Sequence, residues 1–454
     1  MTTMAATTGP TLLQRAMRSS VITVGGFVGS QAIRLASNLI LTRLLFPEAF
    51  GVMAMVSVFL MGLAMFSDVG VGPAIMQSKR GDEQTFLDTA WTIQIVRGFL
   101  LFGVAVLLAW PMARFYGEPQ LVQFLPVSAL TLLIAAFNPT RLQTANRHMQ
   151  AGRVTLIDLV TQLAGVIFAL LLALVWPSVW VLVLSGIVSV LTQLLCLNLF
   201  LPGQRNRLHW EPEAGRELIH FGKWIFLSTV CGFAIGQADK VVIGRWLDTY
   251  AFGIYNIGFF LASFPLLMAG VVTHRVLIPI YRESPPAASR ANFMRLRRMR
   301  FVATAGLMAM VTVMAFIGVW LVDFLYDDRY LAAGGVVVLV SVVQMPALIG
   351  MTYDQAALAA GDSRSYFVLA ATRALFITLG LVLGLEVAQV AGALMGLGLA
   401  WIASYPVVIW LARTQGAWDP LHDAVFALYS AIAGGLALWI FWPEVHALSA
   451  LTGL

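Results

Sequence analysis

The chain has 454 residues, of which 59% are hydrophobic and only 11% are charged, and its formal net charge is +6. A soluble globular protein carries about a quarter charged residues, so this composition excludes a soluble protein of this size. The apolar residues form continuous runs rather than ten-residue segments of alternating polarity, which predicts an all-α polytopic membrane protein. The arginines lie between these runs rather than in one patch, so the charge does not indicate binding to nucleic acid.

The N-terminal segment, residues 1–19, is polar and then weakly amphipathic. This pattern predicts a short helix at the cytoplasmic surface of the membrane. The first apolar run continues past Arg34 without a small-residue cleavage pattern, so we expect a first membrane span and not a signal peptide. Cys196 and Cys231 lie inside apolar runs and lack the spacing of a metal site or a disulfide framework.

The apolar runs that follow are long enough to cross a bilayer, at about 20 residues for each crossing. Six runs predict an N-terminal lobe over residues 20–201, and six more predict a C-terminal lobe over 218–413. A basic cytoplasmic connector covers 202–217, and one extra span with a tail fills 414–454. The runs lie near 20–44, 50–77, 86–112, 120–146, 153–176, 178–201, 218–247, 250–281, 300–325, 330–359, 364–387, 390–413 and 421–442.

Basic residues alternate along the boundaries between these runs. The boundaries after even-numbered runs are rich in arginine, as in the segment 290–300, whereas the other boundaries mix arginine with acidic residues. Positively charged loops face the cytoplasm, so the N-terminus is predicted to be cytoplasmic. A missed or wrongly added helix would disrupt this alternation from that point on. The alternation is regular along the chain, which supports the predicted spans.

Two stretches near the outer ends of the first and seventh runs share one pattern. Arg43–Gly51 reads RLLFPEAFG and Arg245–Gly253 reads RWLDTYAFG, so both fit R-x-L-x-x-x-A-F-G. A shared pattern at a fixed offset indicates an internal duplication. Six crossings is an even number, so both halves enter the membrane in the same direction and form parallel repeats. The working site is then expected at their interface, near the bilayer midplane.

Several ionisable residues lie inside the apolar runs, where each charge costs about 2.5–3.5 kcal/mol on insertion scales. Such residues face a watery cavity or a partner rather than lipid. Cations outnumber carboxylates among them, and guanidinium groups match phosphate oxygens in bidentate fashion. The sequence therefore predicts a cationic cavity for an anionic ligand such as a lipid pyrophosphate. The residues concerned are Arg34, Asp68, Arg97, Asp239, Lys240, His274, Arg275 and Arg373.

Uncharged polar residues accompany the cations at helical spacing. Gln31, Arg34 and Asn38 fall on one stripe of the first run. The third and seventh runs each place a glutamine three residues before a cation, so that both share a face. The predicted substrate-binding residues are Gln31, Arg34, Asn38, Gln94, Arg97, Gln237, Lys240 and Arg373.

Four other residues are candidates for ion coupling or gating, and each also has a structural explanation. Asp68 lies in a glycine-rich stretch where it equally suits helix packing. Asp239 can pair with a neighbouring helix, and His274 is a lone histidine. Arg275 lies near enough to the inner face for its side chain to reach the interface.

The sequence carries no motif of an enzyme. It lacks a G-x-x-x-x-G-K-[ST] loop, and its cytoplasmic loops are too short to fold alone. We therefore expect no catalysis, no cofactor and no metal. Transport would then draw on substrate gradients, ion coupling or removal of the product.

Three motifs resemble those of bacterial polysaccharide transporters: Leu41–Gly51, Ser67–Ile75 and Gln237–Gly244. Over nearly the whole chain the sequence is similar to Wzx-type oligosaccharide flippases of the MOP superfamily, whose relatives include the lipid II flippase MurJ and MATE drug exporters. This resemblance implies a V-shaped pair of six-helix lobes that alternates between inward-open and outward-open forms. The chain departs from the fourteen-helix members because it ends about one span after the twelve-helix core.

The resemblance also implies a function in the bacterial inner membrane. An undecaprenyl-diphosphate-linked oligosaccharide would move from the cytoplasmic to the periplasmic leaflet for exopolysaccharide, O-antigen or capsule synthesis. The implied partners are membrane lipids, H⁺ or Na⁺ as a coupling ion, and a polysaccharide polymerase or co-polymerase.

Three alternatives stay open. A MATE-like drug/cation antiporter would need intramembrane carboxylates, for which only Asp68, Asp239 and Asp354 are candidates. A lipid II flippase would bind the same lipid diphosphate, so the sequence does not separate it from an exopolysaccharide flippase. A non-transporting scaffold has no reason to carry the insertion cost of intramembrane charges.

Overall fold

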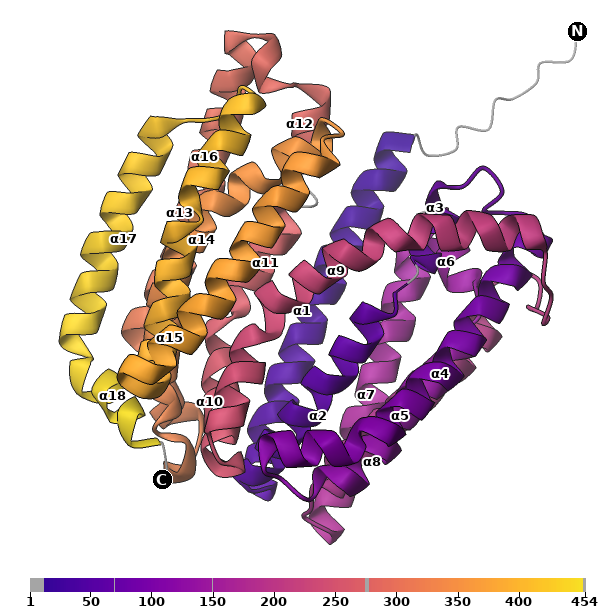
Figure 1. Cartoon of the computed structure of the whole chain (residues 1–454), viewed down its shortest axis with the longest axis horizontal. Coiled ribbons are helices and arrows are strands. Elements are labelled where there is room, and N and C mark those ends of the chain that lie inside the picture. The colour runs from indigo at the N-terminus through magenta and orange to yellow at the C-terminus, as the bar shows by residue number, and fades with distance from the viewer. Residues whose placement is uncertain (1–11, 69, 149, 274–276, 452–454) are drawn as a thin grey trace, which may run out of the picture.

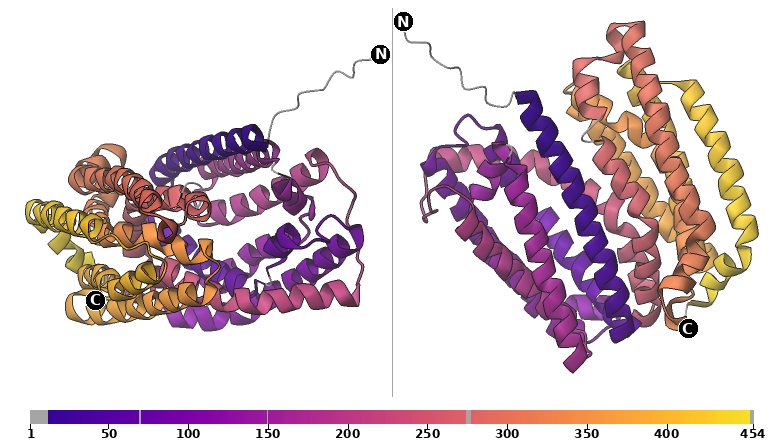
Figure 2. Two further views of the ribbon diagram at one scale, coloured as in Figure 1. Left: turned by 90° about the horizontal axis from the view of Figure 1, so that it is seen from above. Right: turned by 180° about the vertical axis from the view of Figure 1, so that it is seen from behind.

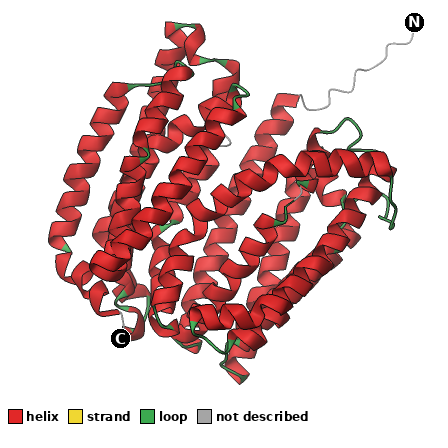
Figure 3. Ribbon diagram, in the orientation of Figure 1, coloured by secondary structure: helices red, strands yellow, loops and turns green. Residues whose placement is uncertain are grey.

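A computed structural model describes residues 12–68, 70–148, 150–273 and 277–451 (Figure 1). Within these ranges the chain forms helices joined by short loops and contains no strand (Figure 3). This confirms the predicted all-α fold. Helix α1 is continuous from Leu12 to Leu44, so residues 12–19 extend the first span and do not form a separate surface helix.

The N-terminal lobe consists of α1 to α8. Two of its predicted spans are broken into a longer and a shorter helix, at residues 67–70 and 137–140. The helices are α1 Leu12–Leu44, α2 Pro47–Phe66, α3 Val71–Gln77, α4 Gln84–Tyr116, α5 Leu121–Ala136, α6 Arg141–Arg147, α7 Ala151–Val175 and α8 Trp180–Phe200.

The C-terminal lobe begins with α9, which crosses obliquely from the N-terminal lobe (Figure 1). It packs against α2 and α4 of that lobe and against α15 of its own. The helices are α9 Pro212–Trp246, α10 Thr249–Ala262, α11 Phe264–Val272, α12 Ile278–Glu283, α13 Arg290–Leu325, α14 Ala333–Ala359, α15 Ser363–Ala403, α16 Tyr405–Thr414, α17 Pro420–Ile440 and α18 Trp442–His446; the 3₁₀ turns are η2 Pro286–Ala288, η3 Asp328–Tyr330 and η4 Ala447–Leu451.

The two lobes form a V, as the views from the front and from behind both show (Figures 1 and 2). We call the end with residues 78–83, 201–211 and 284–289 the diverging end. The converging end contains residues 45–51 and 247–253, where the lobes meet. The V-shaped pair of lobes expected from the sequence is therefore present, with α17 as the extra helix.

Apolar helices of membrane-spanning length run through both lobes. Eight helical stretches in the described ranges are long and apolar enough to cross a membrane, or up to ten if each of two bent pairs is one span. The polar stripes of α1 and α9 keep these two helices out of that set, although both have more than 30 residues. The chain is therefore a multi-pass membrane protein.

The stretch labelled α15 is a hairpin of two antiparallel helices. Its backbone leaves the helical region at Ala388 and Gln389. A Cβ on Gly384 would lie 2.0 Å from the carbonyl oxygen of Gly392. A Cβ on Gly380 would likewise lie 2.3 Å from the carbonyl oxygen of Gly396. Residues this far apart in the sequence cannot be in contact within one straight helix, which rises 1.5 Å per residue. Glycines at every fourth position let the two backbones approach this closely.

Two carboxyl groups, of which Asp419 is buried and Asp423 is half-buried, attach the extra helix α17 to the lobe. Asp419 caps the helix by accepting from the amides of Leu421 and His422. Its carboxylate also accepts from the guanidinium of Arg297, at 2.5 Å and 2.6 Å. Asp423, one turn further on, accepts from the hydroxyl of Tyr353 at 2.7 Å. These contacts tie α17 to α13 and α14.

The repeated stretches meet each other at the converging end. A Cβ on Gly51 would lie 1.9 Å from the carbonyl oxygen of Thr249, and one on Gly253 would lie 2.0 Å from that of Pro47. Gly51 and Gly253 are equivalent in the R-x-L-x-x-x-A-F-G pattern, and so are Pro47 and Thr249. The contact is therefore reciprocal, as in the self-complementary interface of a twofold dimer.

We predict that Gly51→Ala lowers the free energy of unfolding. The added methyl group would clash with the backbone of Thr249, which cannot move aside as a side chain can. Overpacking of this kind costs about 1–3 kcal/mol. The measurement is the thermal unfolding midpoint of the purified protein in detergent. Gly306→Ala is the matched control, because nothing lies within 4 Å of its Cβ position. Equal midpoints for the two variants would contradict the close packing at Gly51.

We also predict that Asp419→Asn destabilises the protein by about 2 kcal/mol at neutral pH, because it breaks the ion pair between a buried carboxylate and the partly exposed Arg297. Burial by itself would raise the pKa of Asp419, but hydrogen bonds from Arg297 and from the His422 amide lower it below its ordinary value. A carboxyl group with a lowered pKa stabilises the fold above its unfolded pKa of about 3.9 and loses this effect as the pH falls through its folded pKa.

Unfolding of the wild type and the Asp419→Asn variant should therefore differ most at neutral pH and converge below about pH 4. Glu386→Gln is the control, because Glu386 is exposed and makes no hydrogen bond within the described ranges. A difference that stays constant down to acidic pH would show that the ion pair is not its cause.

Candidate functional site

Two cations from different helices converge on one segment of α10. The guanidinium carbon of Arg34, on α1, lies 5.0 Å from the ring centre of Phe260. The ammonium nitrogen of Lys240, on α9, lies 5.2 Å from the ring centre of the adjacent Phe259. Each ring offers the negative face of its π system to a cation. Because α1 and α10 belong to different lobes, this group of four residues lies between the lobes.

Arg34 is an exposed cation without a counterion. Its side chain is exposed although the residue lies far from either end of α1. Among the described residues, neither a carboxylate nor a hydrogen-bond acceptor contacts its guanidinium. An isolated cation inside a bilayer is costly unless water or an anion reaches it. Arg34 can therefore receive an anion at the face that it turns toward the C-terminal lobe.

Lys240 has only neutral partners among the side chains that contact it. Its ammonium group donates to Oε1 of Gln237 at 3.0 Å, as their spacing in the sequence suggested. The neighbouring Asp239 is buried, and its carboxylate accepts from the hydroxyl of Tyr255 on α10 at 2.7 Å. The carboxylate is thus held against the neighbouring helix, while Lys240 remains half-exposed.

Arg97 binds the end of a broken helix. Its Nε donates to the Ser67 hydroxyl at 3.0 Å, and its Nη2 donates to the carbonyl of Ala64. Ala64 lies in the last turn of α2, whose carbonyl groups have no partners within the helix, and Ser67 is the residue that caps this end. Asp68 forms the break itself by accepting from the amide of Gly70 at 2.8 Å. Arg97 and Asp68 therefore have structural contacts at the junction of α2 and α3.

Gln94 binds the end of α5, as Arg97 binds the end of α2. Its side-chain amide donates to the carbonyl groups of Ala136 at 3.0 Å and Asn138 at 3.2 Å, where α5 ends. Gln94 and Arg97 share a face of α4, as their spacing predicted. That face contacts two helix ends.

Arg373 is neutralised inside the C-terminal lobe. Its guanidinium pairs with the carboxylate of Asp354 on α14 through two hydrogen bonds of 2.5 Å and 2.8 Å. Both residues are buried, and the guanidinium also lies over the ring of Trp401 at 5.2 Å. Arg373 thus lacks the free charge that we expected of a cavity residue, and the ligand site proposed below does not include it.

The other predicted residues fall into two groups. Gln31 is half-buried on the stripe of Arg34 and makes no hydrogen bond to a described residue. Asn38, further along that stripe, accepts from the hydroxyl of Tyr326 in the C-terminal lobe at 3.0 Å. His274 and Arg275 lie outside the described residues.

A seam of polar contacts joins the lobes at the converging end. Arg329, in the turn after α13, donates to the carbonyl groups of Thr42 at 2.9 Å and Leu45 at 3.4 Å, at the end of α1. Its guanidinium is oriented by an ion pair with Asp327. Together with the bond between Asn38 and Tyr326, these contacts hold α1 to the C-terminal lobe.

Sequence reasoning missed three residues of this arrangement. Arg329 was expected only as a charge at an outer boundary. Phe259 and Phe260 belong to an apolar run in which nothing distinguishes them from packing residues. Phe46, which lies 5.7 Å from the Arg329 guanidinium, is part of the repeated stretch and could have signalled a role for the turn beside it.

The fold and the apolar spans define a two-lobed, multi-pass membrane protein. Solved structures with this fold include the lipid II flippase MurJ in an inward closed conformation, with a TM-score of 0.70, 12% identity, and coverage of 95% of this chain and 96% of MurJ. An inward-facing multidrug resistance transporter of the MATE family gives a TM-score of 0.60, 15% identity, and coverage of 86% and 95%. Identities this low show a shared fold.

The sequence pattern of one family, described as polysaccharide biosynthesis protein, matches residues 40–334. The chain belongs to this family. It is 23% identical over 297 residues to the teichuronic acid biosynthesis protein TuaB of Bacillus subtilis strain 168, over 63% of this chain and 57% of TuaB. It is 24% identical over 258 residues to the succinoglycan biosynthesis transport protein ExoT of Rhizobium meliloti strain 1021, over 56% and 51%. The matched region thus spans little more than half the length of these relatives.

Proposed function

We propose that this protein is a flippase that moves undecaprenyl-diphosphate-linked oligosaccharides across the bacterial inner membrane. The polysaccharide biosynthesis family and the fold shared with a lipid II flippase support this proposal. The observation that carries it is the pair Arg34 and Lys240, which stands between the lobes without a carboxylate partner. The reaction is transport, and we propose no catalytic step.

The diphosphate group is the part of the substrate that this pair suits. A guanidinium group forms paired hydrogen bonds to phosphate oxygens, and an ammonium group adds a mobile point charge. Phe259 and Phe260 place the two cations without neutralising them. A diphosphate between Arg34 and Lys240 would supply the missing counterions, while the lipid tail remains in the bilayer.

The direction of transport follows from the charge of the two ends. The diverging end carries most of the arginines, among them Arg80, Arg205, Arg298 and Arg364, so we assign it to the cytoplasm. The lobes in this structure therefore diverge toward the leaflet in which the substrate is assembled. Transport requires that the seam at the converging end opens, which releases the substrate to the periplasmic leaflet and to a polymerase or co-polymerase.

Among the residues predicted for coupling, Asp239 supports a role with H⁺ or Na⁺ best. It is a buried carboxyl group with one side-chain hydrogen bond, from Tyr255, and it adjoins Lys240 in the chain. Uptake of a cation there would change the charge beside the ligand site.

A drug/cation antiporter is the second candidate, because the MATE transporters share the fold. An antiporter of this kind would need free intramembrane carboxylates, and the three candidates each have a partner. Asp354 is paired with Arg373, Asp68 is bound in a turn, and Asp239 is held by Tyr255. A deletion strain with unchanged drug susceptibility and reduced surface polysaccharide would favour the flippase.

We predict that Arg34→Gln and Lys240→Gln each reduce transport by about tenfold or more, because a hydrogen bond to a charged group is worth about 1.5–3 kcal/mol. The measurement is the amount of surface polysaccharide in a deletion strain that expresses each variant at the wild-type protein level. Arg34→Lys should retain part of the activity, because it keeps the positive charge but cannot form the paired hydrogen bonds of a guanidinium group. Arg364→Gln, at an exposed arginine, is the control. Normal polysaccharide in both charge-removing variants would contradict the site.

A second prediction concerns the seam. Arg329→Gln removes the cation that binds the end of α1, so the converging end should open in a larger fraction of molecules. Spin labels at Gln120 and Glu386, near this end of each lobe, should show an increased population of long distances. Arg114→Gln is the control, because Arg114 stacks on Trp110 of its own helix. An unchanged distance distribution for Arg329→Gln would exclude Arg329 from the seam.

A further inference from the structure

The connector between the lobes is bound along the outside of α4, and we call residues 204–211 the strap. Asp88, in the second turn of α4, accepts from the backbone amide of Arg207 and from the side chain of Asn206, both at 3.1 Å. Thr92, one turn further on, donates to the carbonyl of His209 at 2.9 Å and accepts from its amide at 3.0 Å. The strap thus has a fixed position on the N-terminal lobe.

The surface of α4 changes from polar to apolar where the strap ends. Val96 lies one turn beyond Thr92, about 5.4 Å along the helix axis. It begins a stripe of exposed apolar residues that continues through Leu100 and Leu107, with exposed fractions of 61%, 60% and 76%. In a membrane protein such a stripe faces lipid. The strap therefore lies at the depth where the hydrocarbon region meets the headgroups.

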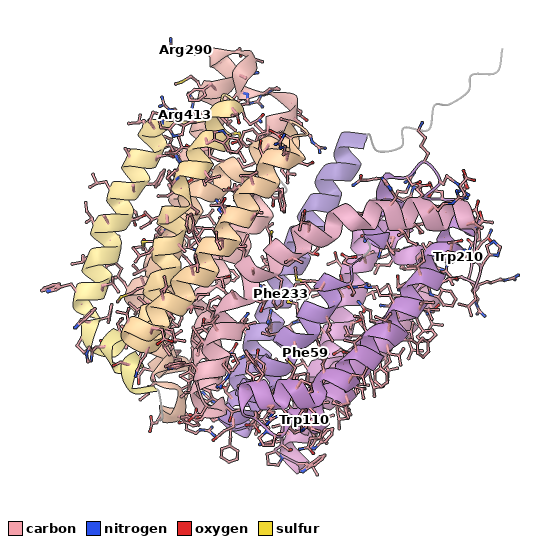
Figure 4. All side chains as sticks on the ribbon, in the orientation of Figure 1. Phe59, Trp110, Trp210, Phe233, Arg290 and Arg413 are labelled. Atoms are coloured by element: carbon pink, nitrogen blue, oxygen red, sulfur yellow. The ribbon has the colours of Figure 1, made fainter. Side chains whose placement is uncertain are left out.

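The strap presents both apolar and cationic side chains at this depth. Leu208 is 70% exposed and Trp210 is 52% exposed, and Arg205 and Arg207 are exposed beside them. The Trp210 ring rests on Gly215 of α9, where a Cβ would lie 2.8 Å from the ring atom Cζ2. Figure 4 shows Trp210 at the outer edge of the N-terminal lobe.

The side chains of the two arginines in the strap take no part in the contacts that hold it to α4. The side chains of Arg205 and Arg207 make no hydrogen bond or ion pair with any described residue. Arg80 nearby is different, because it pairs with Glu211 at 2.8 Å. The charges of Arg205 and Arg207 are therefore available to a partner outside the chain.

We propose that the strap is an anchor that binds the anionic phospholipid headgroups of the surrounding leaflet. Tryptophan concentrates at membrane–water interfaces, because its ring is apolar while its N–H can bond to headgroups. Arginines beside it attract anionic lipids, and this attraction falls off within a Debye length of the surface. The strap combines Trp210, Leu208 and two unpaired arginines on a rigid backbone. It fixes the depth of the N-terminal lobe independently of the transported substrate.

The test uses the full chain in nanodiscs of phosphatidylcholine with or without one quarter phosphatidylglycerol. A fluorescent bimane is attached at Leu208→Cys, and the native Cys196 and Cys231 are both buried. The control position is Arg290→Cys, at the tip of α13 (Figure 4). Lipids with a spin label on the headgroup should quench the probe at position 208, and aqueous iodide should not. The probe at position 290 should show the opposite pattern.

The preference for anionic lipid is measured in the mixed discs. Quenching is compared between discs in which phosphatidylglycerol carries the spin label and discs in which phosphatidylcholine carries it. Quenching at position 208 should be stronger when phosphatidylglycerol carries the label. Each arginine near an anionic surface contributes about fivefold in local occupancy. The double variant Arg205→Gln/Arg207→Gln should therefore lose this preference and keep the wild-type unfolding midpoint.

Two results would overturn the proposal. A probe at position 208 that iodide quenches as strongly as the one at position 290 would place the strap in water, where a protein partner could bind it. Equal quenching by both labelled lipids would show an anchor without preference for anionic headgroups. Neither result bears on the transport proposal, which is tested separately by surface polysaccharide.

Discussion

The reciprocal approach of two glycines is the constraint on which the two-lobed structure depends. Gly51 and Gly253 let the N-terminal turns of α2 and α10 come into backbone contact, each glycine facing the carbonyl of the other lobe. Beyond the glycines the two helices share an apolar core, in which Val52 and Met55 of α2 cluster with Tyr255 of α10.

The two lobes differ at positions that the repeated stretches make equivalent. Asn38 and Lys240 occupy equivalent positions, because both lie five residues before the arginine that begins the repeated stretch. Asn38 bonds to Tyr326 and helps to close the seam, whereas Lys240 faces Phe259 as part of the candidate ligand site. Equivalent positions thus make a structural contact in one lobe and present a charge in the other.

The sequence was sufficient to predict the helical fold and the paired lobes. Long apolar runs indicate the membrane-spanning helices, and the repeated motif indicates two similar halves. It was not sufficient to sort the intramembrane charges. Arg97 was expected in a cavity, but α2 breaks at Ser67, and the Ser67 hydroxyl and the Ala64 carbonyl at that break accept its hydrogen bonds. Arg373 pairs with Asp354, nineteen residues earlier on the preceding helix, and only tertiary packing brings them together. Helical spacing reports which face a residue occupies and not what that face meets.

The contrast between the buried arginines and the exposed Arg34 is the strongest argument for the site. Where the chain buries an arginine for structure, it also supplies acceptors. Arg141 donates to backbone carbonyl groups of the connector, and Arg300 bonds to the Ala417 carbonyl and the Tyr281 hydroxyl. Arg34 lies between the lobes with no acceptor from the described chain, although such a charge costs about 2.5–3.5 kcal/mol to insert. The fold supplies acceptors to its structural cations and none to Arg34, which is the reason for our proposal that an anion entering between the lobes provides them.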